Sequence, residues 1–239
     1  MTILAYQLDS YLKSTESTVT AVDAENHAIQ LDRTPFFPGG GGQPHDTGYI
    51  EYSQGVAQIS RVKKIGAEIW HFIDAESALP AINERISAHI DWDRRYQLMR
   101  THTAMHILCG VVYRDFGALV TGGDMDPLKG RMDFEFENLS RDLVQVIEAA
   151  VNREVQAAHE VRVKILPREE AFQIPDLIRT KINLLPPGIT EIRTIELVGL
   201  DLQADGGTHV ANTSEVGTMR IVDYKSKGKI NKRIYVELD

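Results

Sequence analysis

The N-terminal part of the chain, residues 5–92, alternates between hydrophobic and polar positions with a period of two. The clearest runs cover residues 17–22, 27–31, 56–62 and 68–73, and turn-forming residues separate them at 24–26, 39–42, 53–55 and 66. Short strands at such regular spacing are typical of an antiparallel barrel or sandwich. We therefore predict a small antiparallel β-barrel-like domain over residues 1–92, with a short helical insert at 75–83 before a last strand at 85–91.

The pattern changes to a helical period after residue 92. Hydrophobic residues from Leu98 to Val112 recur at helical spacing, and Gly117 is a suitable end for this long helix. Ser140 can cap a second helix. The buried stripe of this second helix should contain Leu143, Val146, Ile147, Ala150, Val151 and Val155.

The rest of the second half reads as strands and loops. Residues 161, 163 and 165 alternate like a strand, prolines at 167, 175, 186 and 187 indicate a looped region, and residues 219–224 and 233–238 form a predicted hairpin. We predict an α+β fold, in which the barrel-like domain precedes an α+β domain at 93–239 with a long helix and an antiparallel sheet.

Composition narrows the classes of function. The chain of 239 residues is 43% hydrophobic and 25% charged, as in ordinary globular proteins, and no apolar run approaches the roughly 20 residues of a membrane helix. The net charge of -8 disfavours a general nucleic-acid coat, and we expect a cytoplasmic protein with no membrane and no DNA partner. Cys109 is the single cysteine, so a metal site would have to use histidine and carboxylate ligands.

Two histidines four residues apart, His102 and His106, lie within the predicted long helix. This spacing places both imidazoles on one face of a helix, where they can reach a single cation. Metalloproteases with this motif have a glutamate after the first histidine, and Thr103 stands there instead, which disfavours peptidase chemistry. Such pairs are also common as ordinary core or surface residues, so the motif needs a partner elsewhere in the chain.

The segment DGGTH at residues 205–209 provides that partner. Its glycines allow a sharp turn that brings Asp205 and His209 onto one side, although by itself the segment fits a solvated turn better. Together with His102 and His106 it supplies three imidazoles and one carboxylate, which complete a tetrahedral ligand set for zinc. Four other histidines are interpreted as ordinary core or surface residues: His27, His71, His89 and His159. The role of His45, next to the glycine run, is left open.

Two further segments are unusual in composition, the first rich in glycine and the second rich in lysine. The first follows TPFFP and contains Gly39, Gly40, Gly41, Gly42 and Gln43. It matches neither a Walker loop nor a dinucleotide fingerprint, so it is either a flexible hairpin loop or a backbone surface that a ligand can approach closely. The second lies at the tip of the predicted hairpin and is either a solvated turn or a phosphate-contacting patch. Its basic residues are Lys225, Lys227, Lys229, Lys232 and Arg233.

The motifs HTAMH and GGTHV, the upstream PGGGGQP loop and the terminal SKGKINKR segment together resemble the free-standing alanyl-tRNA editing proteins known as AlaX. They also resemble the editing domain of alanyl-tRNA synthetase and, more distantly, that of threonyl-tRNA synthetase. The resemblance covers nearly the whole chain, in the same order, and the length is similar to that of the medium class.

This resemblance implies a barrel-like N-terminal domain and a zinc-containing editing domain that hydrolyses the ester of Ser-tRNA(Ala), with Gly-tRNA(Ala) as a second candidate substrate. The family's helix ligands fall on His102 and His106, and its third histidine falls on His209. The family's usual cysteine before the two glycines is Asp205 here. A carboxylate is a legitimate zinc ligand but a harder one, so we expect one zinc per chain and a site open to other divalent metals.

The resemblance also suggests which residues recognise the substrate, a tRNA(Ala) mischarged with serine or glycine. An editing site must spare Ala-tRNA, so a polar group has to be left unpaired when the serine hydroxyl is absent. Thr34 and Thr103 are the candidates, with Gln43 behind them, and we favour Thr34 because it precedes the glycine loop. Two alternatives stay open: a non-catalytic tRNA-binding relative that lost its metal site through Asp205, and a hydrolase of an unrelated small ester.

Overall fold

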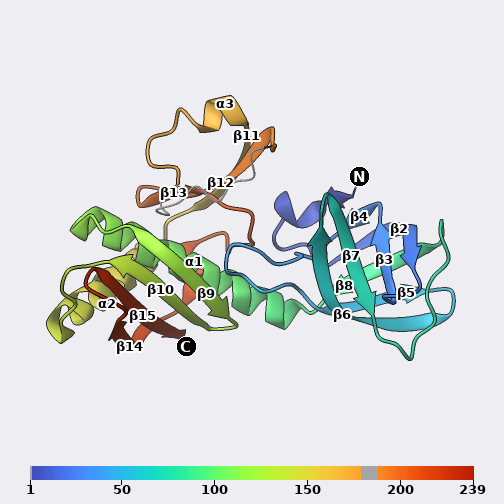
Figure 1. The fold of residues 1–239 in the computed structure, drawn as a ribbon, viewed down its shortest axis with the longest axis horizontal. Coiled ribbons are helices and arrows are strands. Elements are labelled where there is room, and N and C mark those ends of the chain that lie inside the picture. Colours follow the sequence, from blue (N-terminus) through green and yellow to red (C-terminus); the bar gives the residue numbers. More distant parts are fainter. Residues whose placement is uncertain (1, 179–187) are drawn as a thin grey trace. The chain divides into compact units, whose positions relative to one another are not determined.

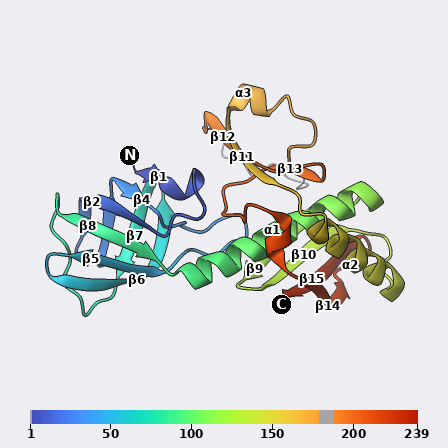
Figure 2. The same cartoon turned by 180° about the vertical axis from the view of Figure 1, so that it is seen from behind.

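The computed structural model describes residues 2–178 and 188–239, and the part of the predicted looped region at Pro186 and Pro187 lies outside them. The chain forms two compact units, Met1–Gln97 and Leu98–Asp239 (Figures 1 and 2). The boundary between them falls inside helix α1, Trp92–Phe116. A domain division after residue 92 stays a prediction, because compactness does not test independent folding. No described helix is long and apolar enough to cross a membrane.

The first unit is built around a closed antiparallel barrel with the strand order β2-β3-β7-β6-β5-β8. This confirms the barrel predicted from the period-two runs. Two short strands, β1 (Ile3–Leu4) and β4 (Arg33–Thr34), pair in parallel beside it, with the turn η1 (Ala5–Gln7) between them in sequence. The barrel strands are β2 (Ser14–Asp23), β3 (Ala28–Leu31), β5 (Gly48–Tyr52), β6 (Gly55–Ile65), β7 (Glu68–Ile73) and β8 (Arg85–Ile90).

The alternation of side chains fills the barrel with aliphatic residues. In β7, Ile69, His71 and Ile73 are buried while Trp70 and Phe72 are only partly covered on the outside. The predicted helical insert at 75–83 is wrong, because these residues form turns. Pro80 lacks the N–H that a helix needs, and Asn83 takes a left-handed φ of 69°.

The glycine-rich loop before β5 has a defined turn at its tip. Gly40 and Gln43 exchange two backbone hydrogen bonds of 3.0 Å around Gly41 and Gly42, whose φ angles are 59° and 86°. Two consecutive positive φ angles fit the tight hairpin turn that favours glycine at both central positions. The four-glycine run therefore has a conformational reason to be glycine.

A buried ion pair holds the base of the same loop. Arg95 and Asp46 are both fully buried, and the Arg95 Nε lies 3.0 Å from Asp46 Oδ1. Arg95 also donates to the carbonyl oxygens of Ser10 and Pro35, while the Phe37 N–H donates to Asp46 Oδ2 at 2.6 Å. The remaining hydrogen-bonding capacity of both charges is thus used, which is what makes such a buried pair tolerable.

The second unit combines α1 with a four-stranded antiparallel sheet of order β14-β15-β10-β9 and the helix α2, Arg141–Gln156. Gly130 lets α1 lie close to this sheet, since a Cβ there would stand 2.7 Å from the sulfur of Met105. The sheet confirms the predicted C-terminal hairpin. Its strands are β9 (Val120–Asp126), β10 (Lys129–Glu135), β14 (Met219–Ser226) and β15 (Asn231–Leu238).

Both predicted helices are present, and each has the predicted terminating or capping residue at one end. α1 ends before Gly117, whose φ is 65°, and the Ser140 side chain caps α2 by accepting from the Leu143 N–H at 3.2 Å. The predicted stripe of α2 needs a correction, because Val144 is buried whereas Val146 is 54% exposed.

A second antiparallel sheet, of order β11-β12-β13, carries one half of the candidate site. Its strands are β11 (Val161–Pro167), β12 (Glu191–Leu197) and β13 (Asp201–Ala204), and β11 confirms the strand predicted at 161–165. The short helices α3 (Arg168–Ala171) and η2 (Thr213–Val216) complete the unit. Gly110 of α1 admits the turn before β13, because a Cβ there would lie 3.0 Å from that of Asp201.

Candidate metal centre

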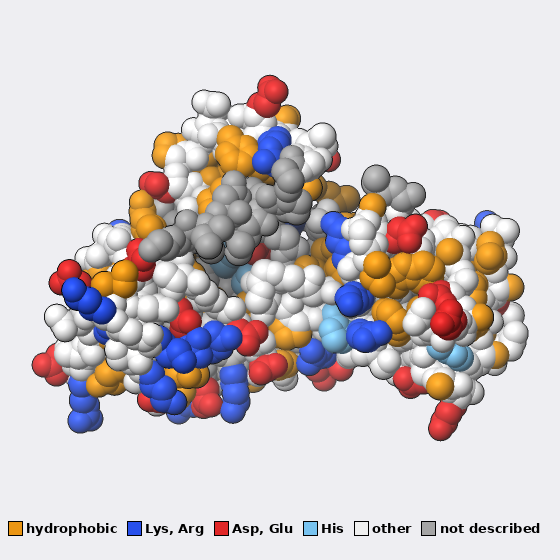
Figure 3. Space-filling model, in the orientation of Figure 1, with side chains coloured by type: hydrophobic (Ala, Val, Ile, Leu, Met, Phe, Trp, Pro, Cys, Tyr) orange, Lys and Arg blue, Asp and Glu red, His pale blue; other side chains and the backbone are white. Residues whose placement is uncertain are grey.

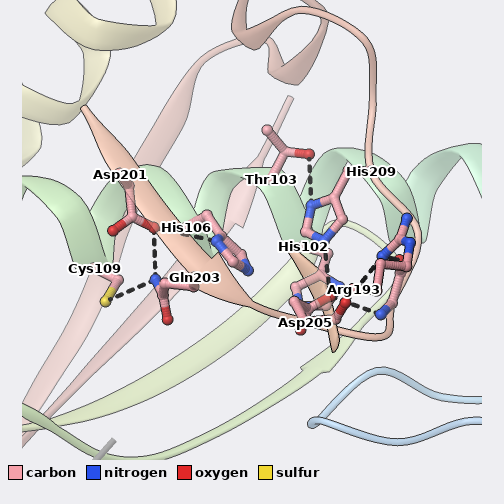
Figure 4. A network of polar contacts seen from close by, with 10 residues as sticks. His102, Thr103, His106, Cys109, Arg193, Asp201, Gln203, Asp205 and His209 are labelled. Atoms are coloured by element: carbon pink, nitrogen blue, oxygen red, sulfur yellow. Dashed lines mark hydrogen bonds and ion pairs between the residues drawn. The ribbon is translucent and has the colours of Figure 1, made fainter. Parts of the chain in front are cut away.

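Four side chains of the second unit converge on one point: His102, His106, Asp205 and His209. The first two lie on consecutive turns of α1, and the other two lie in the loop that follows β13 (Figure 4). Their candidate ligand atoms all lie within 4.8 Å of one another. The structure thus brings together the HxxxH and DGGTH motifs, which are about a hundred residues apart in the sequence.

The distances fit a common metal ion. Asp205 directs Oδ1 to the Nε2 of His209 at 3.0 Å and Oδ2 to the Nε2 of His102 at 3.5 Å. Ligands at roughly 2.1 Å from a tetrahedral ion lie about 3.4 Å from one another. Three imidazoles and a carboxylate at this spacing fit zinc or a similar divalent ion, although the identity of the metal does not follow from them.

Hydrogen bonds on the far side of two rings fix which nitrogen faces the centre. His106 points Nδ1 to Asp201 Oδ2 at 3.2 Å, and His209 points Nδ1 to the Thr103 hydroxyl at 3.3 Å. The Thr103 oxygen also accepts the Val210 N–H at 3.2 Å. In each ring Nδ1 is engaged, so Nε2 is the nitrogen available to a metal. This arrangement is the usual support of a metal-bound histidine.

Burial keeps two of the three imidazoles neutral. It lowers the pKa of His102 from 6.5 to about 4, and it holds the pKa of His209 well below its usual value. For His106, burial acts in the same direction, but the hydrogen bond that it donates to Asp201 and the nearby carboxylates raise its pKa. For Asp205, burial is outweighed by the imidazoles of His102 and His209, and its pKa falls well below the usual value. A neutral imidazole and an ionised carboxylate are the forms that bind metals.

Arg193 of β12 holds the ligand loop by its backbone. Its Nη1 donates to the carbonyl oxygens of Asp205 at 3.1 Å and Gly207 at 2.7 Å, and the Gly207 N–H returns a hydrogen bond of 2.6 Å to Asp205 Oδ1. Arg193 is 7% exposed, so its positive charge lies inside the unit. Its charge adds to the lowering of the pKa of His102 and opposes the rise in the pKa of His106.

Three residues of this site escaped the sequence analysis: Asp201, Gln203 and Arg193. Gln203 Nε2 donates to Asp201 Oδ2 at 2.6 Å and lies 3.3 Å from the sulfur of Cys109, so a chain of contacts runs from His106 outward (Figure 4). No sequence pattern pointed to Arg193 or to Asp201, whose partner His106 is 95 positions away.

The residues predicted to recognise the substrate lie in different units. Thr103 belongs to the second unit, beside His209, whereas Thr34 and Gln43 belong to the first and are buried there. The Thr34 hydroxyl lies 2.7 Å from Nε2 of His71, whose Nδ1 faces the Ile29 carbonyl oxygen at 3.2 Å. That carbonyl can only accept, so His71 carries its proton on Nδ1 and the Thr34 hydroxyl donates to Nε2.

The basic residues at the C-terminal hairpin are in part engaged within the protein. Lys225 pairs with Asp223 at 3.0 Å, and Arg233 pairs with Asp133 at 2.6 Å. Lys232 is 7% exposed and donates to two carbonyl oxygens of the turn. Lys227 and Lys229 are exposed and form no ion pair among the described residues. They are therefore the members of this set that are best placed to contact a phosphate.

Comparisons with known proteins agree with the geometry. Residues 5–94 match the model of the class II (A) tRNA synthetases, and residues 192–235 match that of the second additional domain of threonyl and alanyl tRNA synthetases. Alanyl-tRNA editing proteins AlaX-M from Saccharolobus solfataricus and Methanosarcina barkeri are 41% and 35% identical, each over at least 98% of both chains. The alanine–tRNA ligase of Ignicoccus hospitalis is 34% identical over 90% of this chain and 23% of its own. The chain belongs to the family of the AlaX-M alanyl-tRNA editing proteins.

Proposed function

We propose that this protein is a trans-editing hydrolase that deacylates mischarged tRNA(Ala), with Ser-tRNA(Ala) as the main substrate and Gly-tRNA(Ala) as a second one. The observation that carries the proposal is the cluster of His102, His106, Asp205 and His209 in a chain of this family. An ester at the 3′ end of a tRNA is already activated, so its hydrolysis needs a positioned water and a polarised carbonyl.

The need for such an activity follows from the limits of binding selectivity. A synthetase pocket that binds alanine cannot strongly reject serine, which adds one hydroxyl, or glycine, which lacks one methyl group. A separate hydrolytic site removes the resulting errors. It must bind serine through a group that alanine leaves unpaired, because size alone would admit alanine as well.

The residues of the metal centre have distinct parts in the proposed reaction. His102, His106, Asp205 and His209 would hold one divalent ion, which when bound lowers the pKa of a water or polarises the ester. Four protein ligands favour anchoring of the ester and the terminal adenosine, since a catalytic zinc normally keeps one position open. Thr103 and Asp201 orient the rings of His209 and His106, and Arg193 holds the loop of Asp205.

Selectivity for serine is proposed to come from a threonine hydroxyl, first that of Thr34. The Thr34 hydroxyl donates a hydrogen bond to His71, and its oxygen accepts one from the Phe36 N–H at 3.1 Å. One lone pair of this oxygen is left for a further donor. A serine hydroxyl can donate to that lone pair, and alanine cannot. Thr103 is the second candidate, with Gln43 behind both.

The first experiment is a deacylation assay on Ser-, Gly- and Ala-tRNA(Ala), with and without a chelator. We expect hydrolysis of Ser-tRNA(Ala) well above that of Ala-tRNA(Ala), and loss of that activity with the chelator. Metal-free protein that binds tRNA without hydrolysis would support the non-catalytic relative instead. Activity on simple esters without competition by tRNA would support the unrelated hydrolase.

A second experiment tests selectivity with matched variants. Thr34→Val keeps the shape of the side chain but removes the hydroxyl, so the ratio of Ser-tRNA to Ala-tRNA hydrolysis should fall more than the overall rate. Thr103→Val is the comparison. An unchanged ratio in Thr34→Val together with a reduced one in Thr103→Val would transfer the role to Thr103.

A further inference from the structure

The outer face of strands β6 and β7 carries cations that have no ion-pair partner among the described residues. Arg61 and Lys63 are both exposed and lie on this face, because the antiparallel register pairs them with the outward residues of β7. The salt bridges of the described chain involve neither of them, whereas Lys225 and Arg233 of the C-terminal hairpin are both paired. A protein with a net charge of -8 that binds an RNA needs local positive potential, and this face provides it.

Aromatic rings lie directly opposite both cations. The antiparallel register places Arg61 across from Phe72 and Lys63 across from Trp70. The guanidinium carbon of Arg61 lies over the Phe72 ring, 3.9 Å from its centre. Trp70 and Phe72 are partly exposed on the outside of the barrel, where no barrel packing requires an aromatic residue.

The charge on this face is not cancelled locally. Glu68 is the acidic residue on the same side of β7, opposite Ile65, and its carboxylate accepts a hydrogen bond of 2.9 Å from Gln30. Two positive charges therefore face one negative charge. Figure 3 shows hydrophobic side chains gathered over one face of the barrel unit, with basic and acidic side chains beside them.

Alternating cations and aromatic rings are the means by which proteins bind unpaired nucleotides. Cations contact the phosphates, and aromatic faces stack on bases of any sequence. A guanidinium held over a ring can still donate to a phosphate through its N–H groups. An acidic protein partner could also contact the cations and the partly exposed Trp70, but the proposed function already supplies a ligand with phosphates and unpaired bases.

We propose that the outer face of β6 and β7 is a tRNA-contacting surface, in which Arg61 and Lys63 meet phosphates and Trp70 stacks on an unpaired base. The inference rests on the proposed function, because tRNA is its ligand. It concerns a surface of the barrel unit and not the metal centre.

The test measures binding of uncharged tRNA(Ala) transcript, so that hydrolysis does not enter. A double variant, Arg61→Gln with Lys63→Gln, should lower the slope of log K against log salt by about 1.4 to 1.8, at roughly 0.7–0.9 for each lost contact. The control removes the same charge from two other exposed positions, with Arg85→Gln and Lys164→Gln. Its slope should remain that of the unaltered protein.

Trp70 can be followed directly, because the chain has two tryptophans and Trp92→Phe leaves Trp70 alone. tRNA should quench its emission, and Trp70→Leu should weaken binding about tenfold. Equal slopes in the double and control variants would overturn the surface proposal, as would unchanged Trp70 emission at saturating tRNA. A wild-type protein that deacylates Ser-tRNA(Ala) but shows these results would leave the proposed function intact, whereas no binding of tRNA at all would refute both.

Discussion

Replacement of Asp201 by asparagine gives the sharpest test of how the metal centre is supported. Asp201 is 5% exposed, and its Oδ2 accepts hydrogen bonds from the Nδ1 of His106 at 3.2 Å and the Nε2 of Gln203 at 2.6 Å. Asparagine has nearly the same shape and can present one amide oxygen to both donors. The substitution therefore removes the negative charge behind His106 and leaves most of the geometry.

The expected size of the effect follows from the role of such partners. Loss of a group that orients a metal-bound histidine typically lowers metal affinity 10- to 100-fold, or about 1.4–2.7 kcal/mol. For Asp201→Asn, the loss of metal affinity should be near the lower limit because an acceptor remains. For Asp201→Ala, the loss should be near the upper limit because the Nδ1 proton of His106 then has no acceptor there. Gln203→Ala leaves the contact with His106 in place and should reduce metal affinity less than either substitution.

Two measurements separate positioning from general damage to the fold. Zinc affinity is obtained by competition with a chromophoric chelator, and the absorption of the cobalt-substituted protein reports the ligand geometry. Glu154→Gln is the matched control, because it disturbs another carboxylate–imidazole contact, with His159 at 2.8 Å, outside the ligand cluster. The reasoning fails if Asp201→Asn binds zinc as tightly as the wild type and gives the same cobalt spectrum.

Three other predictions use the same protein. The wild type should retain a metal but lose it readily to chelators. Asp205→Cys should bind zinc more tightly in a competitive titration, because a thiolate is the softer ligand. If the wild type bound no metal under any condition and the variant did, the result would point to the non-catalytic relative. Lys227→Gln with Lys229→Gln should lower the salt slope of tRNA binding by up to about 1.8, whereas Lys232→Gln should mainly reduce stability. Burial lowers the pKa of His71 from 6.5 to about 4, so the unfolded state binds the proton first and His71 destabilises the fold as the pH falls from 6.5 to 4. In urea unfolding, the loss of stability over this range should be about 3 kcal/mol larger in the wild type than in His71→Gln, in which His102 and His209 still contribute to the loss.

The parts of the fold that local periodicity controls were predictable from the sequence. The spacing of His102 and His106 sufficed because a helix repeats every 3.6 residues, so four positions return to one face. The barrel was predictable because one side of each strand faces an aliphatic core, which imposes alternation. The C-terminal hairpin followed for the same reason, with buried residues at every second position of β15.

The parts that depend on distant partners were not predictable. β12 buries Arg193 and Thr194 side by side, so its pattern does not alternate, and β9 contains two adjacent glycines and three acidic or polar exposed positions. Asp201 lies in a four-residue strand, and its partner His106 is 95 positions away. Lys232 looked like a surface cation, but its ammonium folds back onto the carbonyl oxygens of Gly228 and Lys229.

The charge balance of the centre is compatible with an aspartate in the ligand set. A carboxylate and a thiolate each contribute one negative charge, so Asp205 keeps the charge of the ligand set and changes its hardness and reach. Around it, Asp201 adds a second negative charge behind His106, and the buried Arg193 adds one positive charge beside the ligand loop. A divalent ion would therefore turn a net charge of about -1 into about +1, which suits a substrate that presents an ester carbonyl and the phosphates of a tRNA end. Asp205 also accepts the Gly207 N–H with the oxygen that faces His209, so the same carboxylate both shapes its loop and offers a ligand atom. A thiolate at this position would have to give up most of that hydrogen bond, and the gain in zinc affinity of Asp205→Cys is the difference between these two effects.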